Sequence, residues 1–262
     1  MSLWIQLASG AVLMVGFFLL GWLWSRKIDN YSLIDAFWAF GIGITAVFWL
    51  ALGEWTLKHG VAAAMIGLWS LRLGGHLQKR IRKHHPIEDS RYAKLREIWQ
   101  GSVASKFFWL FQAQALSVIL LAIPFLMISQ DADSTWGLWE SAGLLVWTAG
   151  ILGESVADSQ MAAFKQENHS SSVVCRSGLW YYSRHPNYFF ESVIWIGFYV
   201  FACGSPWGWT TFHAPVLITS LLLFVTGIPP TEASAVKRKG EAYRLYQKST
   251  SAFIPWFPKK LN

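Results

Sequence analysis

Long runs of apolar residues recur along the chain and are separated by shorter polar segments. Each run approaches the roughly 20 residues that an α-helix needs to cross the hydrocarbon core of a bilayer. The runs are continuous rather than short and alternating, so they predict helices and not a β-barrel. We therefore expect an all-α polytopic membrane protein with seven transmembrane helices, at residues 3–24, 32–53, 59–78, 106–128, 136–158, 187–204 and 210–228.

The composition agrees with this interpretation. The 262 residues are 53% hydrophobic and only 14% charged, whereas a soluble domain contains about 25% charged residues. The two cysteines, Cys175 and Cys203, fall on opposite sides of the predicted membrane and have no metal-ligand spacing, so neither a disulfide nor a metal site is expected. No internal repeat is visible, and we predict a single integral membrane domain over residues 1–262.

Lys and Arg are concentrated in the regions that follow the first, third, fifth and seventh predicted spans. The alternate loops contain Lys58 together with Glu54, Asp131 and Asp133. Because Lys and Arg accumulate on the cytoplasmic side, the N-terminus is predicted outside and the C-terminus in the cytoplasm. The net charge of +7 is therefore a signal of topology that also suits anionic lipid headgroups. Nothing indicates nucleic acid or a required protein partner.

Ionisable side chains lie within the predicted spans or at their cytoplasmic ends, at similar depth: Asp35, Arg72, Glu154, Asp158 and Glu191. Charged groups at membrane depth are costly and mark functional sites. Alternatively, each side chain reaches the headgroups or forms a structural pair such as Asp35–Arg72. As a set they favour one cavity that opens to the cytoplasm.

The most distinctive motif is the aromatic and basic run Gly178–Tyr188, which precedes the sixth span. It contains Arg184, His185 and Asn187, side chains suited to holding a charged, flat cofactor. Glu191 follows Asn187 by one helical turn, so the two share a face. A basic loop with aromatic anchors at the membrane edge is the alternative, and it explains neither Asn187 nor Glu191.

Other polar positions extend this candidate site. Arg91 and Tyr92 follow Asp89 in the loop after the third span, and a plain basic anchor needs neither the acid nor the tyrosine. Lys165 lies two turns beyond Asp158 on one helix face. No glycine-rich nucleotide loop follows a strand, so any nucleotide must be held by the membrane helices and their loops.

The C-terminal region Lys239–Tyr246 is predicted to form an amphipathic cytoplasmic helix. Tyr243 and Tyr246 either cover a bound cofactor or belong to the aromatic belt at the interface.

These motifs resemble those of membrane reductases of the steroid 5α-reductase family, particularly its bacterial branch of uncharacterised proteins, and of the related sterol C14 and C7 reductases. The resemblance covers about residues 154–258 and rests on Arg184-His185-Pro186-Asn187-Tyr188 with Glu191, on Asp158-Ser159-Gln160 with Phe164-Lys165, and on Gly240–Tyr246.

The resemblance implies a seven-helix enzyme of the bacterial inner membrane whose active site opens to the cytoplasm. NADPH would transfer a hydride to the polarised C=C bond of a steroid-like or other lipid enone. The catalytic residues implied are Asp35, Glu191 and Arg72. The cofactor-binding residues implied are His76, Arg91, Tyr92, Glu154, Asp158, Lys165, Arg176, Trp180, Tyr182, Arg184, His185, Asn187, Tyr243 and Tyr246.

One departure concerns the third span. The steroid reductases pair the acid of the second span with a Tyr there, whereas this chain has Trp69. An indole N–H donates a hydrogen bond but no proton. The departure argues against a 3-oxo-4-ene steroid substrate and leaves the reductase chemistry in place.

A second interpretation is a membrane methyltransferase of the isoprenylcysteine or phospholipid type, which would use S-adenosylmethionine. Those enzymes also have an Arg-His-Pro run before a helix and a similar C-terminal Tyr-x-x-Tyr. Asn187 and Asp158-Ser159-Gln160 favour the reductase, as does Thr231-Glu232-Ala233 in place of a Glu-Glu pair. A non-enzymatic lipid-binding or scaffold protein is a third class, and it leaves the polar residues unexplained.

Overall fold

The computed structural model describes residues 1–168 and 172–260. Within these ranges the chain is helical and contains no strand, with one isolated bridge between Ser183 and Ser251. The all-α prediction is confirmed. The chain divides into two compact units, Met1–Gly137 with Ala202–Thr211 (unit 1) and Leu138–Phe201 with Phe212–Asn262 (unit 2).

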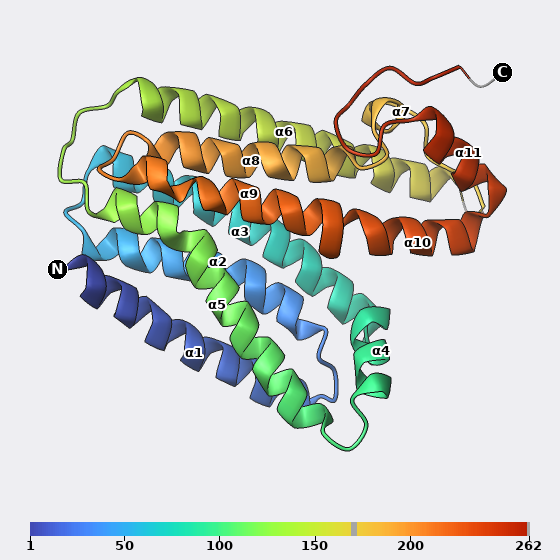
Figure 1. The fold of residues 1–262 in the computed structure, drawn as a ribbon, viewed down its shortest axis with the longest axis horizontal. Coiled ribbons are helices and arrows are strands. Elements are labelled where there is room, and N and C mark those ends of the chain that lie inside the picture. Colours follow the sequence, from blue (N-terminus) through green and yellow to red (C-terminus); the bar gives the residue numbers. More distant parts are fainter. Residues whose placement is uncertain (169–171, 261–262) are drawn as a thin grey trace. The chain divides into compact units, whose positions relative to one another are not determined.

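Unit 1 is built on α1 (Leu3–Lys27), α2 (Leu33–Leu52), α3 (Leu57–His84), α4 (Ser90–Ile98) and α5 (Val103–Ser129). Helix α2 packs against both α3 and α5, and α1 packs against α5 and α2 (Figure 1). The apolar faces of α2 and α5 meet around Trp49, which is fully buried with Ala122 and Leu126.

A cluster of buried polar groups around Gln6 is hydrogen-bonded inside this helical packing. The indole Nε1 of Trp49 donates to the carbonyl oxygen of Gln6 at 2.7 Å. The Gln6 side-chain oxygen accepts from Ser129 Oγ at 2.8 Å and from Gln130 Nε2 at 2.7 Å. Because a buried polar group without a partner is costly, these bonds determine how α1, α2 and α5 meet at this end of unit 1.

A buried ion pair joins the start of α3 to the segment after α5. Lys58 Nζ lies 2.9 Å from Asp131 Oδ2, and the two side chains are only 3% and 5% exposed. Asp131 Oδ1 also accepts from the backbone N–H of Asp133 at 3.0 Å. Such a pair depends on both partners, since removing one leaves a buried charge without compensation.

Unit 2 contains α6 (Leu138–Glu167), α7 (Leu179–Tyr182), α8 (Pro186–Ala202), α9 (His213–Ser220), the π-helical turn η2 (Leu221–Val225), α10 (Ile228–Lys239) and α11 (Glu241–Ser249). The 3-10 turn η1 (Gly208–Phe212) precedes α9.

Helices α6 and α8 approach closely because glycines face the partner helix. A Cβ on Gly150 of α6 would lie 2.8 Å from the backbone nitrogen of Ile194, and one on Gly197 of α8 would lie 2.5 Å from that of Trp147. Small residues at such positions are typical of membrane helix pairs.

Among the residues that the structure describes, four helices are long and apolar enough to cross a membrane: Leu3–Lys27, Leu33–Leu52, Val103–Ser129 and the continuous stretch Gly208–Lys239. All seven predicted segments are helical, but the remaining three depart from a simple span. Helix α8 has 17 residues, α3 continues into the basic segment that ends at His84, and α6 carries Glu140 and Glu154. Seven crossings and the orientation stay predictions.

Replacing Lys58 with Met should lower the free energy of unfolding by about 3–5 kcal/mol, because Asp131 is then buried without its cation. The double variant Lys58→Met/Asp131→Asn should recover much of this loss, since the amide keeps the acceptor for Asp133. Chemical unfolding in detergent measures both values. A double variant that is no more stable than the single one would contradict the assignment.

Candidate functional site

The residues predicted for the site fall into two groups, one in each unit. Unit 1 contains Asp35, Arg72, His76, Arg91 and Tyr92. Unit 2 contains Glu154, Asp158, Lys165, Arg176, Trp180, Tyr182, Arg184, His185, Asn187, Glu191, Tyr243 and Tyr246. That the two groups share one cavity stays a prediction.

The Arg184 side chain donates three hydrogen bonds within unit 2. Its Nε donates to Glu232 Oε1 at 2.6 Å, and its Nη1 donates to the carbonyl oxygens of Gln247 at 2.8 Å and Thr250 at 2.6 Å. The guanidinium group thus connects the segment before α8 to α10, α11 and the residue that follows α11. This arrangement uses the planar, multiple donors that distinguish Arg from Lys.

Glu232 completes this network from α10. Its Oε1 also lies 3.2 Å from His185 Nε2, and its Oε2 accepts from Gln247 Nε2 at 2.8 Å. Sequence reasoning treated Glu232 only as a departure from the methyltransferase pattern and missed its role here. Arg184 and His185, both predicted to bind a cofactor, therefore bind the protein's own carboxylate.

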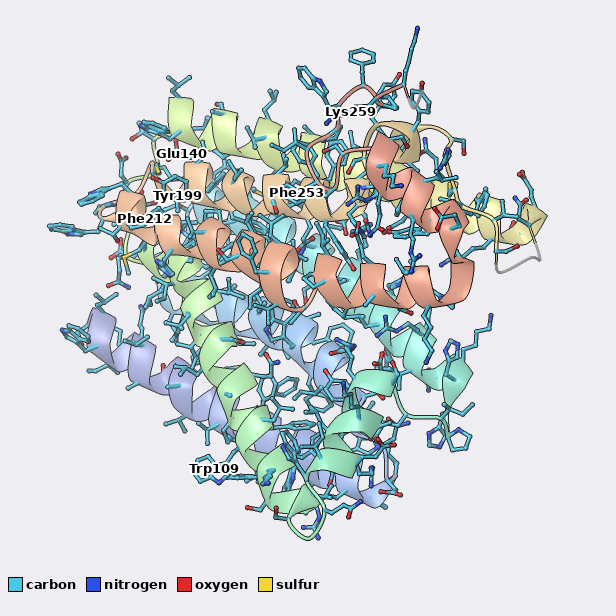
Figure 2. The ribbon with its side chains drawn as sticks, turned by 45° about the vertical axis from the view of Figure 1, so that its right-hand side comes forward. Trp109, Glu140, Tyr199, Phe212, Phe253 and Lys259 are labelled. Atoms are coloured by element: carbon cyan, nitrogen blue, oxygen red, sulfur yellow. The ribbon has the colours of Figure 1, made fainter. Side chains whose placement is uncertain are left out.

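The C-terminal stretch lies along the same segment. The backbone N–H of Arg184 donates to the carbonyl oxygen of Ser251 at 2.8 Å, and Ser183 Oγ donates to that of Phe253 at 2.8 Å. Figure 2 labels Phe253 and, farther along the same stretch, Lys259. The stretch that follows α11 is therefore part of the candidate site.

A small cavity of about 270 Å³ lies at this position, lined by Arg176, Tyr181, Ser249, Thr250, Pro258 and Lys259. The Arg176 guanidinium lies over the Tyr246 ring, 5.3 Å from its centroid. Two cations thus border one cavity. Sequence reasoning included Arg176 but missed Lys259, which in the sequence is one of two adjacent lysines near the end of the chain.

Trp180 and Tyr246 stabilise the loop from within. Trp180 Nε1 donates to the carbonyl oxygen of Ala157 at 2.9 Å, and the Tyr246 hydroxyl donates to the carbonyl oxygens of Trp180 and Ser183. Burial raises the pKa of Tyr246, and burial together with the charge of Glu232 raises the pKa of Tyr243 to about 12. Both phenols are therefore protonated at neutral pH.

One residue of the motif Asp158-Ser159-Gln160, Gln160, connects α6 to the loop before α7. The Gln160 side-chain oxygen accepts from the backbone N–H of Leu179 at 2.8 Å. It packs against Gly178, whose φ of 58° favours glycine, and a Cβ there would collide with the Gln160 amide. The glycine that begins the aromatic run is therefore required for α6 to contact the loop.

Asn187 and Glu191 lie in the first turns of α8. Glu191 is buried, and its Oε1 accepts from Trp195 Nε1 at 2.8 Å. The Asn187 Oδ1 atom is buried as well, but no donor for it is found among the described residues. The next ring in the motif, Tyr188, stacks on His185 with centroids 5.3 Å apart. Asn187 thus presents an acceptor for which the described residues offer no donor.

In unit 1, Asp35 is the centre of a second network. Its Oδ1 accepts from the Tyr92 hydroxyl at 2.5 Å, and its Oδ2 accepts from Arg91 at 2.6 Å and Arg80 at 3.2 Å. Asp89 caps α4 by accepting from the backbone N–H of Arg91 at 3.0 Å. The side chains Arg91 and Tyr92 of α4, which were predicted to bind a cofactor, therefore bind Asp35.

The phenol beside Asp35 comes from α4 and not from α3. Tyr92 is buried, and its burial together with the nearby Asp35 carboxylate raises its pKa well above the usual value. Trp69 on α3 is fully buried. The third predicted span has no tyrosine to pair with Asp35. Asp35 instead pairs with Tyr92, which lies 57 positions farther along the chain.

Comparison with known proteins gives a family without an assigned activity. A family model described as "Protein of unknown function (DUF1295)" matches residues 21–250. An uncharacterized protein of Schizosaccharomyces pombe is 26% identical over 276 residues, covering 93% of this chain and 78% of the relative. No solved structure matches.

Glu232→Gln should loosen the C-terminal region, because Arg184 then loses the carboxylate that its Nε contacts. The pair is half-buried, with side chains 10% and 16% exposed, and a hydrogen bond to a charged group contributes about 1.5–3 kcal/mol, so we expect faster amide exchange over residues 241–258. Hydrogen–deuterium exchange measures this. Glu241→Gln is the matched control, since its pair with Arg244 is exposed and contributes little. Equal exchange in both variants would contradict the role of Glu232.

Proposed function

Since this chain belongs to the DUF1295 family, described as proteins of unknown function, we propose its activity from its own residues. The protein is an NADPH-dependent membrane reductase that acts on the polarised C=C bond of a steroid-like or other lipid enone. The observation that supports this most directly is the buried Asn187 Oδ1 without a donor. It lies in the motif that resembles the steroid 5α-reductases and sterol reductases.

The residues fit a pyridine dinucleotide in two respects. A buried acceptor left without a donor costs about 1–3 kcal/mol, and a nicotinamide carboxamide supplies an N–H₂ group for Asn187. The cations Arg176 and Lys259 border one cavity and suit phosphate oxygens. Lys165, exposed near the end of α6, adds a third cation. When bound, NADPH supplies the hydride that such a reduction needs.

The proposed acid–base groups are Asp35 with Tyr92, and Glu191. Tyr92 donates to Asp35, so the phenol is held in one orientation. On substrate binding this hydroxyl turns from Asp35 to the oxygen of the enone, where it stabilises the negative charge that develops. Glu191 is the second acid, buried and oriented by Trp195. Arg72, on α3, completes the proposed catalytic set.

The proposed reductase also has a proposed location. The site opens to the cytoplasm, where NADPH is available, and the chain resides in a bacterial inner membrane. The basic regions after α1 and at the end of α3 support this orientation through the cytoplasmic excess of Lys and Arg.

Titration of the purified protein with NADPH and, separately, with S-adenosylmethionine tests the proposal. Binding of NADPH with no binding of S-adenosylmethionine supports the reductase. The reverse result would replace it with the methyltransferase. Binding of neither would leave the chain without a cofactor-dependent activity and refute the proposal.

Asn187→Ala should weaken NADPH binding by roughly ten- to a hundredfold, because one buried hydrogen bond is lost. Isothermal titration on the folded variant measures the change. Tyr188→Phe is the matched control from the same motif, since it removes a hydroxyl that is hydrogen-bonded to the exposed Thr231 and keeps the ring on His185. Equal NADPH affinity in wild type and Asn187→Ala would remove Asn187 from the site.

A further inference from the structure

Unit 1 contains a larger cavity that includes none of the residues predicted for the cofactor or the chemistry. Its volume is about 610 Å³, within the roughly 300–1,000 Å³ that ligand pockets span. It is lined by α1, α2, the turn that connects them and the end of α3, through Phe17, Trp24, Ile28, Leu33, Ala36, Phe37, Phe40, Ile44, Gln78, Ile81, Arg82 and His85.

The walls of this cavity are apolar and are shaped by two glycines. A Cβ on Gly21 would lie 2.7 Å from the Phe37 ring, and one on Gly74 would lie 2.6 Å from the Phe40 ring. Phe17 packs on Phe37 with ring centroids 4.7 Å apart. The rings of α2 are therefore placed directly against the backbones of α1 and α3, which leaves an apolar surface between the helices.

One end of the cavity is polar and positively charged. Gln78 and Arg82 lie four residues apart on α3 and share one face, and His85 directly follows the helix. Other arginines of unit 1 pair with carboxylates, as Arg80 and Arg91 do with Asp35. Among residues 1–168 and 172–260, no such partner of Arg82 is found.

We propose that this cavity binds an anionic membrane lipid, with an acyl chain along the phenylalanine rings and the headgroup at Arg82. The apolar walls exclude a small free anion as the main ligand, and the unpaired guanidinium favours an anionic headgroup over a zwitterionic one. In the predicted orientation this end of α3 faces the cytoplasmic leaflet, where basic residues attract anionic lipids. This inference does not depend on the proposed reductase activity.

Native mass spectrometry of the full-length protein, released from detergent with phosphatidylglycerol or with phosphatidylcholine of the same acyl chains, tests the proposal. We expect more phosphatidylglycerol adducts, by about fivefold. Arg82→Gln should abolish this preference. Lys83→Gln, the neighbouring exposed cation that does not line the cavity, should retain it.

Two further measurements separate the chain from the headgroup. Ile44→Trp adds bulk at a partly exposed lining position and should reduce adducts of both lipids. Oleate that competes with phosphatidylglycerol would show that any anionic amphiphile is accepted, whereas no competition would identify the phospholipid headgroup. An unchanged preference in Arg82→Gln, an equal loss in Lys83→Gln, or unchanged adducts in Ile44→Trp would overturn the proposal.

Discussion

The guanidinium group of Arg184 is the interaction on which the structure of unit 2 depends. It reaches Glu232, Gln247 and Thr250, residues 48, 63 and 66 positions farther along the chain. Because each of these acceptors lies on a different element or at its end, one cation determines where α10, α11 and the C-terminal stretch lie against the start of α8. The surrounding phenols and the Asn187 amide are positioned as a consequence.

Unit 1 contains a similar network, but its central group is an anion and not a cation. There a carboxylate, Asp35, accepts from one phenol and two guanidinium groups, and it thereby attaches α4 to α2. In both networks a residue expected to meet a ligand is bonded to protein groups. Such bonds hold neighbouring groups rigidly. A binding site needs supporting residues of this kind behind the residues that contact its ligand.

The positions of the helices followed from the sequence because apolar runs in a membrane protein have few alternatives to a helix. The predicted span 106–128 thus corresponds to Val103–Ser129. The end of α3 did not follow, since its basic residues are good helix formers and the helix continues beyond the apolar run. The site was predicted in its residue types but not in its pairings. The partner of Arg184 lies in another helix, and spacing along the chain carries no information about such packing.

The place of Ser251 in the structure has a consequence for biosynthesis. A chain is made from its N-terminus, and compact regions form as they emerge from the ribosome. The segment with Arg184 emerges before Thr250 and Ser251, the residues whose carbonyl oxygens accept its hydrogen bonds. Its final arrangement must therefore wait until Thr250 and Ser251 have been made. Until then the segment at the start of α8 is accessible to chaperones and proteases, so nascent chains that stop before Thr250 are distinguishable from longer ones.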